Sequence, residues 1–222
     1  MARQETTRVE IQSPVLAKND AQADRNRARF KELGVSVINL ISSPGSGKTT
    51  LLEAMARELG GKLAVIEGDQ QTERDADRVR RAGVKAVQIE TGDACHLDAK
   101  AVSEAIDELD LENSGVEVVV IENVGNLICP SSYDLGENLK GALLSLPEGD
   151  DKVLKYPSVF CRVGVLLITK MDLQPYMDFD VERAIEETSS LNREFETFKI
   201  SAKTGDGVPE FCDYLVNLSR AS

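Results

Sequence analysis

The residues best suited to chemistry begin in a glycine-rich turn. Residues 42–49 read SSPGSGKT, which places a lysine and a threonine at the spacing of a phosphate-binding loop. In such a loop the backbone N–H groups point toward phosphates, and the N-terminus of the next helix adds partial positive charge. We expect Lys48 to reach the β- and γ-phosphates and the Thr49 hydroxyl to take one position on Mg²⁺. The sequence therefore predicts a nucleotide-phosphate site made of Gly45, Ser46, Gly47, Lys48, Thr49 and Thr50.

One residue of this turn departs from the usual motif. The first position normally holds glycine, and Ser42 stands there instead. The alternative interpretation is an ordinary glycine-rich turn in which the lysine occurs by chance. The apolar run VSVINLI before the turn and the helical pattern after it are the context that the motif requires. They favour the phosphate site.

Two later motifs have the form of guanine-reading segments. Residues 169–172 read TKMD directly after an apolar run, and residues 201–203 read SAK after a short one. The Asp172 carboxylate can accept hydrogen bonds from N1–H and the exocyclic amine of guanine, whereas adenine has no such donor pair. The order of the motifs predicts GTP rather than ATP. The expected nucleotide-binding residues here are Thr169, Lys170, Asp172, Ser201, Ala202 and Lys203.

An acidic segment lies between the phosphate loop and these motifs. Residues 122–125 read ENVG, where most GTPases place D-x-x-G, so we expect Glu122 to hold Mg²⁺ and the glycine N–H to sense the γ-phosphate. The acid is Glu rather than Asp, and Asn126 replaces a water-orienting Gln, which predicts slow hydrolysis.

Two further acids complete the expected magnesium and catalytic set. Asp69 is a candidate for a second magnesium ligand, and Asp75 is a candidate for positioning the attacking water. The alternative for each is a solvated surface charge. The predicted magnesium ligands are thus Thr49, Asp69 and Glu122, and the predicted catalytic residues are Lys48, Asp75 and Glu122.

A separate set of residues suits a softer metal. His96, the single histidine, follows Cys95 directly, and Cys129 lies just past the acidic segment. Sulfur and imidazole donors suit Zn²⁺ or Ni²⁺ rather than Mg²⁺. Adjacent residues cannot close a tetrahedral site alone, so a third ligand and a second chain would be needed. The alternative is a buried cysteine beside a capping histidine.

The elements that must position these residues alternate between strand and helix. Strands are expected at residues 35–41, 62–66, 84–89, 116–121, 163–168 and 198–200, and helices at 15–33, 51–59, 72–81, 97–109, 181–191 and 208–218. This alternation predicts an α/β fold: a doubly wound, mostly parallel sheet with helices on both faces, of the P-loop NTPase kind. Residues 126–157 are expected to form a long irregular connection.

Composition limits the class of protein and its partners. The hydrophobic content of 41% supports one compact domain over residues 35–222, preceded by an arm or edge strand and a helix over residues 1–34. The net charge of −12 argues against a nucleic-acid partner. No apolar run is long enough to span a bilayer, so no membrane partner is expected. The four cysteines form no C-x-x-C pair, which is typical of a cytoplasmic location.

Seven stretches together resemble the HypB family, the nickel-insertion GTPases of hydrogenase maturation: SSPGSGKTTLLE, EGDQQTERDADR, GDACHLDA, VIENVGNLICP, DDKVLKYP, TKMDL and SAKTGDG. The resemblance implies that Cys95, His96 and Cys129 bind Ni²⁺ or Zn²⁺ near a dimer interface. It also implies GTP/GDP and Mg²⁺ as cofactors, a homodimer favoured by GTP, and Lys155 reaching the partner's nucleotide. Expected partners are the hydrogenase large subunit and other nickel-delivery accessory proteins.

Three other interpretations stay open at this point. The chain could be a GTP-switched interaction protein with a structural zinc site, or an accessory GTPase for another metalloenzyme such as urease. A P-loop kinase would require an acceptor site, and the paired TKMD and SAK motifs speak against it. The cysteine-rich or histidine-rich starts of some family members do not occur in this sequence, so nickel storage is not expected.

Overall fold

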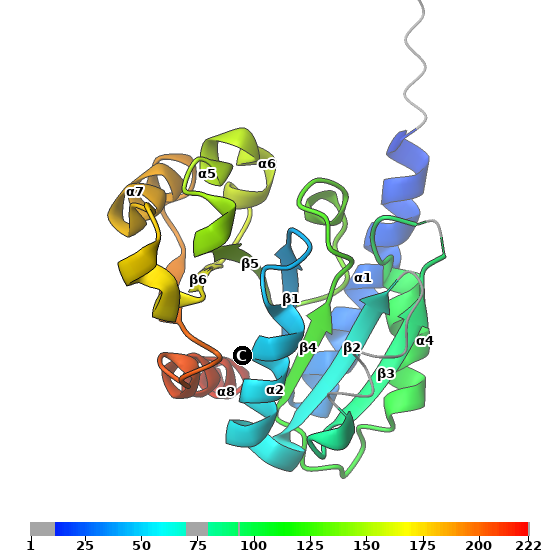
Figure 1. Cartoon of the computed structure of the whole chain (residues 1–222). Helices are drawn as coiled ribbons and strands as arrows, with labels where there is room; N and C mark the ends of the chain where they lie inside the picture. The colour runs from blue at the N-terminus through cyan, green and yellow to red at the C-terminus, as the bar shows by residue number, and fades with distance from the viewer. Residues whose placement is uncertain (1–11, 70–79, 93, 222) are drawn as a thin grey trace, which may run out of the picture.

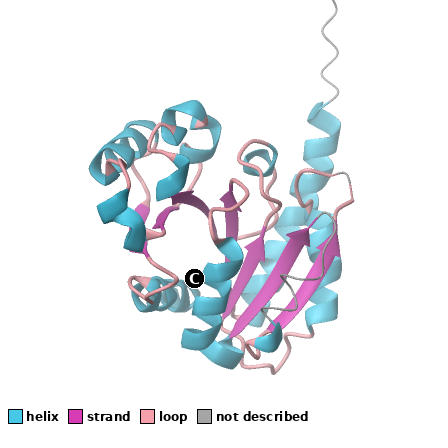
Figure 2. Ribbon diagram, viewed as in Figure 1, coloured by secondary structure: helices cyan, strands magenta, loops and turns pink. Residues whose placement is uncertain are grey.

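The computed structural model describes residues 12–69, 80–92 and 94–221, with side chains from residue 16 to residue 218 apart from that of Asp69. Its seven described strands form one sheet in the order β3-β2-β4-β1-β5-β6-β7, and every neighbouring pair is parallel (Figure 1; Figure 2). The strands are β1 (Ser36–Ser42), β2 (Leu63–Asp69), β3 (Lys85–Glu90), β4 (Val118–Glu122), β5 (Leu139–Ser145), β6 (Val165–Thr169) and β7 (Glu196–Ile200).

Helices cover both faces of this sheet, which confirms the predicted α/β class. The α-helices are α1 (Gln12–Leu33), α2 (Lys48–Leu59), α4 (Ala99–Leu109), α5 (Lys152–Lys155), α6 (Pro157–Phe160), α7 (Val181–Leu191) and α8 (Val208–Ala221). Short 3₁₀ turns lie at η1 (Gly60–Lys62), η2 (Cys129–Ser132), η3 (Leu146–Glu148) and η4 (Met171–Tyr176).

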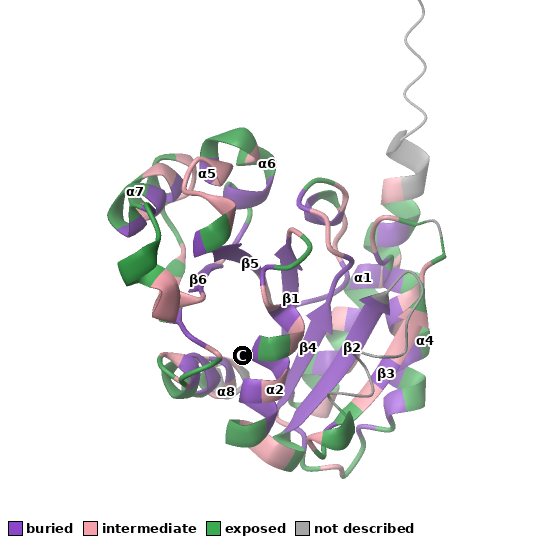
Figure 3. Cartoon of the chain, viewed as in Figure 1, coloured by how far each residue is buried: buried purple, intermediate pink, exposed green. Residues whose placement is uncertain are grey.

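Each central strand supplies side chains to cores on both faces, because successive residues point to opposite sides. Ile38 and Leu40 of β1 pack in one core with α2 and α8. Val37 packs on the other face with α1 and α4, and Ile41 packs on that face with α5, α6 and α7. Figure 3 shows β1 and β4 as buried throughout, as expected for strands in the middle of a parallel sheet.

The first helix is part of this packing. Phe30 of α1 is 2% exposed and lies in the same core as α4. Gly34 follows the helix with φ +68°, a left-handed conformation that glycine adopts without a steric cost. The predicted helix over residues 15–33 is therefore confirmed, with an earlier start at Gln12.

The prediction for residues 126–157 is wrong, because this stretch holds β5, which pairs with both β1 and β6 in the middle of the sheet. Its sequence, LKGALLS, has no β-branched residue, so strand propensity does not mark it. A parallel strand buried on both faces needs only apolar side chains that fit. Gly141 fits closely, since a Cβ there would lie 3.0 Å from Ile38 Cδ1.

Two predicted segments lie mostly outside the described residues. They are the N-terminal arm over residues 1–12 and the helix over residues 72–81. The division into residues 1–34 and 35–222 stays a prediction. Within the described parts of the chain, none of the helices combines the length and the apolar character needed to cross a membrane.

Candidate functional site

The phosphate loop follows the carboxyl end of β1 and leads into α2. Gly45 and Gly47 have φ values of +78° and +96°, which side-chain-bearing residues rarely adopt, so the loop needs glycine at these positions. Lys48 begins α2, and its Nζ donates a hydrogen bond to Ser42 Oγ over 2.7 Å. The residue that departs from the usual motif thus contacts the lysine that the motif requires.

A glutamate that the sequence analysis did not single out supports the same loop. Glu148 Oε2 accepts hydrogen bonds from Ser145 N (2.9 Å) and Ser145 Oγ (2.6 Å), and it lies 2.8 Å from Ser46 Oγ. Burial alone would raise the pKa of Glu148, but the hydrogen bonds from Ser145, Ser43 and Ser46 outweigh burial and lower it. Glu148 is the last residue of η3, the turn that follows β5, so its role depends on a strand that the sequence did not predict.

A pocket of about 460 Å³ opens above the loop, at the carboxyl ends of β1, β2 and β4. All six predicted phosphate residues line this pocket: Gly45, Ser46, Gly47, Lys48, Thr49 and Thr50. The other residues of its wall are Pro44, Glu67, Gly68, Glu122, Asn123, Gly125 and Lys170. Thr49 Oγ1 donates to Glu122 Oε1 over 3.4 Å, so two of the three predicted magnesium ligands lie together. Gly125 packs on the loop, since a Cβ there would lie 3.2 Å from Pro44 Cγ.

Glu67 is a second pocket acid that the sequence analysis missed. It is 3% exposed and lies next to Glu122 in the strand register, because β2 pairs with β4. Its position as the first polar residue after the apolar part of β2 is the feature that would have indicated it. Asp69 ends β2, but its side chain lies outside the description, as does all of Asp75. Their predicted roles stay predictions.

The two predicted base-reading motifs lie together around a pocket of about 280 Å³. Asp172 accepts a hydrogen bond from Ser201 Oγ over 2.9 Å, and Lys203 Nζ lies 3.8 Å from its other oxygen. Ala202 lines the same pocket. A carboxylate held between the two motifs is positioned to accept hydrogen bonds from a base.

Residues from the first of these motifs also contact the phosphate loop. Thr169 Oγ1 donates to Ser46 O over 2.8 Å, and Lys170 Nζ donates to Gly45 O over 2.6 Å. Lys170 adopts a left-handed conformation with φ +60°. Four residues line both pockets: Ser46, Gly47, Thr50 and Lys170. The pocket around the two predicted base-reading motifs therefore adjoins the pocket above the phosphate loop.

The three predicted soft-metal ligands lie together in the structure. One ligand atom from each of Cys95, His96 and Cys129 lies within 4.8 Å of the others. Burial lowers the pKa of His96 more than nearby Asp98 raises it, which favours the neutral imidazole that binds metals. A hydrogen bond with Cys129 and burial raise the pKa of the Cys95 thiol. The two sulfurs and one nitrogen fit Ni²⁺ or Zn²⁺, with a fourth ligand still to be supplied.

The ring of Tyr133 stacks on His96, with centroids 3.8 Å apart. Beside these rings lies a hollow of about 670 Å³, walled largely by α1 through Lys18, Asn19, Ala21, Gln22 and Arg25. Lys155 lines neither nucleotide pocket of its own chain: it is exposed and forms an ion pair with Asp151. Its predicted reach to a partner's nucleotide stays a prediction.

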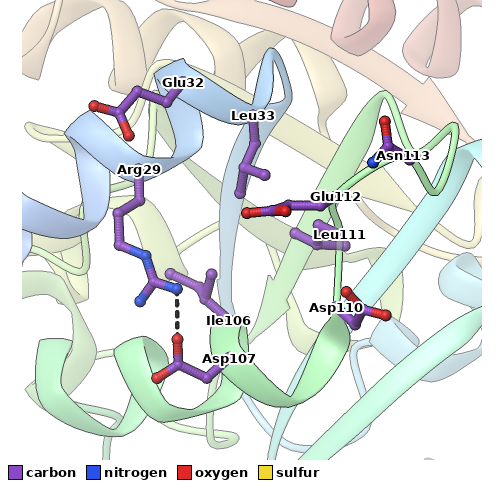
Figure 4. Close-up of a pocket in the computed structure, with 9 residues that line it drawn as sticks. All are labelled: Arg29, Glu32, Leu33, Ile106, Asp107, Asp110, Leu111, Glu112 and Asn113. Atoms are coloured by element: carbon purple, nitrogen blue, oxygen red, sulfur yellow. Dashed lines mark hydrogen bonds and ion pairs between the residues drawn. The ribbon is translucent and has the colours of Figure 1, made fainter.

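A further pocket of about 590 Å³ lies between the C-terminal ends of α1 and α4. Figure 4 shows Arg29 of α1 pointing toward Asp107 of α4, and the two form an ion pair of 2.5 Å. Because α1 ends where β1 begins, this pocket lies at the amino end of β1, opposite the phosphate loop. Of the predicted site residues that the structure describes, none lines this pocket.

Comparisons with known proteins agree with this arrangement. The sequence profile of the family described as CobW/HypB/UreG, nucleotide-binding domain, matches residues 36–199. The chain is 48% identical over 209 residues to the hydrogenase maturation factor HypB of Escherichia coli K12, covering 93% of this chain and 71% of that protein. It is 45% identical to the hydrogenase/urease maturation factor HypB of Helicobacter pylori, covering 96% and 88%.

The fold agrees as well. The crystal structure of HypB from Helicobacter pylori in complex with nickel superposes with a TM-score of 0.87 at 45% sequence identity, covering 92% of this chain and 96% of that one. The phosphate loop, the Cys-His pair and the acidic segment all lie within the matched residues. The chain therefore belongs to the HypB family of hydrogenase maturation factors, among the CobW/HypB/UreG nucleotide-binding domains.

Proposed function

We propose that this protein binds and hydrolyses GTP and assists the insertion of nickel into hydrogenase during its maturation. The observation that carries the proposal is the continuity of two sites along one segment. Glu122 contacts Thr49 in the phosphate pocket, and Cys129, a short distance further along the chain, clusters with Cys95 and His96. A conformational change of this segment at Glu122 would therefore displace the metal ligand Cys129.

GTP is the proposed nucleotide because of the carboxylate between the two base-reading motifs. Asp172 is held by Ser201 and faces the pocket that adjoins the phosphate loop. Guanine offers it two donors, and a base without them would leave a partly buried carboxylate unpaired.

Hydrolysis is proposed to use the charges around the phosphate pocket. Lys48 and the backbone of the loop would neutralise the β- and γ-phosphates, and Asp75 would position the attacking water. Thr49, Glu122 and Asp69 would hold Mg²⁺, with Glu67 a further acid in reach, and the ion would supply charge neutralisation between the phosphates. Because Asn126 follows Gly125, where a glutamine would orient water, turnover is expected to be slow.

Nickel is proposed as the cargo held by Cys95, His96 and Cys129, and Zn²⁺ is the competitor for the same donors. GTP would favour a homodimer in which Lys155 reaches the partner's nucleotide. Hydrolysis would then alter the metal site and pass Ni²⁺ to the hydrogenase large subunit, with help from other accessory proteins in the cytoplasm. The nickel in the similar structure from Helicobacter pylori supports this choice of metal.

A second candidate has a specific observation in its favour. The relative from Helicobacter pylori is described as a hydrogenase/urease maturation factor, so urease is a further possible recipient. The remaining alternative, a structural zinc site, predicts the same metal affinity in every nucleotide state.

The test has two parts. Equilibrium Ni²⁺ and Zn²⁺ titrations in the presence of GDP and of a non-hydrolysable GTP analogue should give different nickel affinities, and size-exclusion mass should rise with the analogue. Complementation of a deletion strain, with hydrogenase and urease activities measured in parallel, identifies the recipient. Equal affinities in both nucleotide states and no rescue would contradict the proposal.

A further inference from the structure

Three buried polar side chains, those of Asn123, Asn39 and Glu137, form a hydrogen-bonded chain that begins in the wall of the phosphate pocket. Asn123 follows Glu122 and is 1% exposed. Its Oδ1 accepts hydrogen bonds from Leu97 N (3.2 Å) and Val124 N (3.0 Å). Leu97 directly follows the metal-ligand candidate His96. One side chain from the acidic segment thus holds the backbone of the Cys95–His96 loop.

Asn39 connects this amide to the central strand. It lies in β1, is fully buried, and its Oδ1 accepts a hydrogen bond from Asn123 Nδ2 over 3.1 Å. The backbone of Asn123 is bound to the same strand, since its N–H donates to Leu40 O over 3.1 Å. An amide in the middle of a parallel sheet is costly unless its groups are hydrogen-bonded. Asn39 is bonded on both sides.

Glu137 carries the connection to the second metal loop. Its Oε1 accepts from Asn39 Nδ2 over 3.3 Å, and its Oε2 accepts from Leu135 N over 2.7 Å. Lys140 Nζ lies 3.6 Å from Glu137 and donates to Tyr133 O over 2.7 Å. Tyr133 stacks on His96 and follows η2, which begins at Cys129. Both ligand-bearing loops are therefore tied to one buried network.

A second contact presses the Cys95–His96 loop against the phosphate pocket. Leu97 is 1% exposed, and a Cβ added at Gly68 would lie 2.7 Å from its Cγ. Gly68 lines the phosphate pocket beside Glu67. A shift at the carboxyl ends of β2 and β4 would consequently move Leu97, because close-packed interiors do not absorb such displacements.

We propose that Asn123 is a positioning residue for the soft-metal site, and that the network of Asn123, Asn39 and Glu137 couples this site to the nucleotide. The proposal rests on the proposed function, since it requires that the chain bind both a nucleotide and Ni²⁺. Coupling between two sites is reciprocal: the nucleotide must change nickel affinity by the same factor as nickel changes nucleotide affinity. The network explains how a buried amide in the wall of the phosphate pocket would set that factor without being a metal ligand.

The test is the nickel affinity of Asn123→Ala, titrated with GDP and with a non-hydrolysable GTP analogue. We expect nickel affinity to fall by about tenfold or more, the usual effect of removing a group that orients a ligand. We also expect the ratio of affinities between the two nucleotide states to fall toward one, and the effect of nickel on analogue affinity to fall equally. The thiolate-to-nickel absorption band should shift, which a loss of stability alone would not cause.

Asn39→Ala is the second variant, because Asn39 lies one step further from the metal loop and keeps the proposal testable if Asn123→Ala does not fold. The double variant should show less than the sum of the two single effects, as expected for residues in one network. Asn192→Ala is the matched control, since Asn192 donates to Val163 O over 2.7 Å at the far side of the sheet. It should leave both affinities unchanged.

The outcomes separate this inference from the proposed function. If the wild-type chain shows no difference between nucleotide states, both the proposed coupling of hydrolysis to nickel delivery and this inference are wrong. If the wild-type chain shows the difference and the folded Asn123→Ala and Asn39→Ala variants keep it, this inference alone is overturned.

Discussion

Lys48 Nζ lies 2.7 Å from Ser42 Oγ, so the first and seventh residues of the phosphate loop are joined by a hydrogen bond. The Ser42 hydroxyl in turn donates to Ser43 O over 2.8 Å. Glycine, which usually occupies the first position, has no side chain to offer the lysine. The serine therefore fixes the ammonium group within the loop and adds a bond that the common motif lacks.

Ser42→Ala should lower the stability of the folded chain. The variant loses a hydrogen bond to a charged group in a buried environment, which typically contributes about 1.5 kcal/mol. Urea unfolding of the wild-type and variant chains measures the difference. Ser190→Ala is the control, because the exposed Ser190 bonds only within its own helix. Equal losses in the two variants would show that Ser42 has no special role.

Asp172→Asn should change which base is bound. The substituted amide presents a donor where guanine also presents one, so GTP affinity should fall by at least about a hundredfold. Xanthine has an oxygen in place of the guanine amine, so xanthosine triphosphate should bind the variant better than the wild type. Competition with a fluorescent guanine nucleotide measures both affinities. If the variant keeps the wild-type preference for GTP over xanthosine triphosphate, Asp172 does not contact the base.

Glu148 should make stability depend on pH. Its pKa is lowered in the folded chain from the ordinary value of 4.5, because the hydrogen bonds from Ser145, Ser43 and Ser46 outweigh burial. A lowered pKa means that the carboxylate stabilises the fold above the unfolded pKa and that this contribution is lost as pH falls through the folded value. Unfolding of Glu148→Gln should therefore differ from wild type at about pH 7 and approach it well below about pH 4. A constant difference across this range would refute the assignment.

Cys95→Ser and Cys129→Ser should each weaken nickel binding by at least about tenfold, since each removes a thiolate ligand. Nickel should also raise the thermal midpoint of the wild type, and a chelator should reverse that rise, because a ligand that binds only the folded state stabilises it. Cys161→Ser is the control: Cys161 is an exposed cysteine outside the cluster. Nickel binding that survives both cluster substitutions would place the metal at another site.

Features that depend on residues close together in the chain are the ones that a sequence predicts most directly. The phosphate loop and the TKMD and SAK motifs are each recognised from a few consecutive residues. Their closeness in space follows because parallel strands have their carboxyl ends at the same edge of a sheet. Cys95, His96 and Cys129 were grouped by the kind of donor atom they carry, and the family resemblance favoured a shared metal over the alternative of a buried cysteine.

Other features could not be predicted from the sequence, because they depend on strand register and on contacts between residues far apart in the chain. The β5 residues Gly-Ala-Leu-Leu carry no strand preference, and only the place between β1 and β6 makes them a strand. Glu67 becomes a pocket acid through its register with Glu122. A polar Asn39 is unexpected in an apolar strand. Its side chain is explained by hydrogen bonds with Asn123 and Glu137, which lie far from it in the sequence.

The central place of β5 also bears on how the chain folds as it is made. When synthesis has reached Glu122, the strands β1, β2, β3 and β4 are complete, and they form one side of the sheet. One edge of β1 then has no partner until β5, residues 139–145, has been synthesised. An open strand edge is prone to pair with other chains, so this interval is the one in which a chaperone would protect the nascent protein. The supports of the phosphate loop, Glu148 and Thr169, come later still. The phosphate loop of a nascent chain therefore gains these supports only after β5 and β6 have been made.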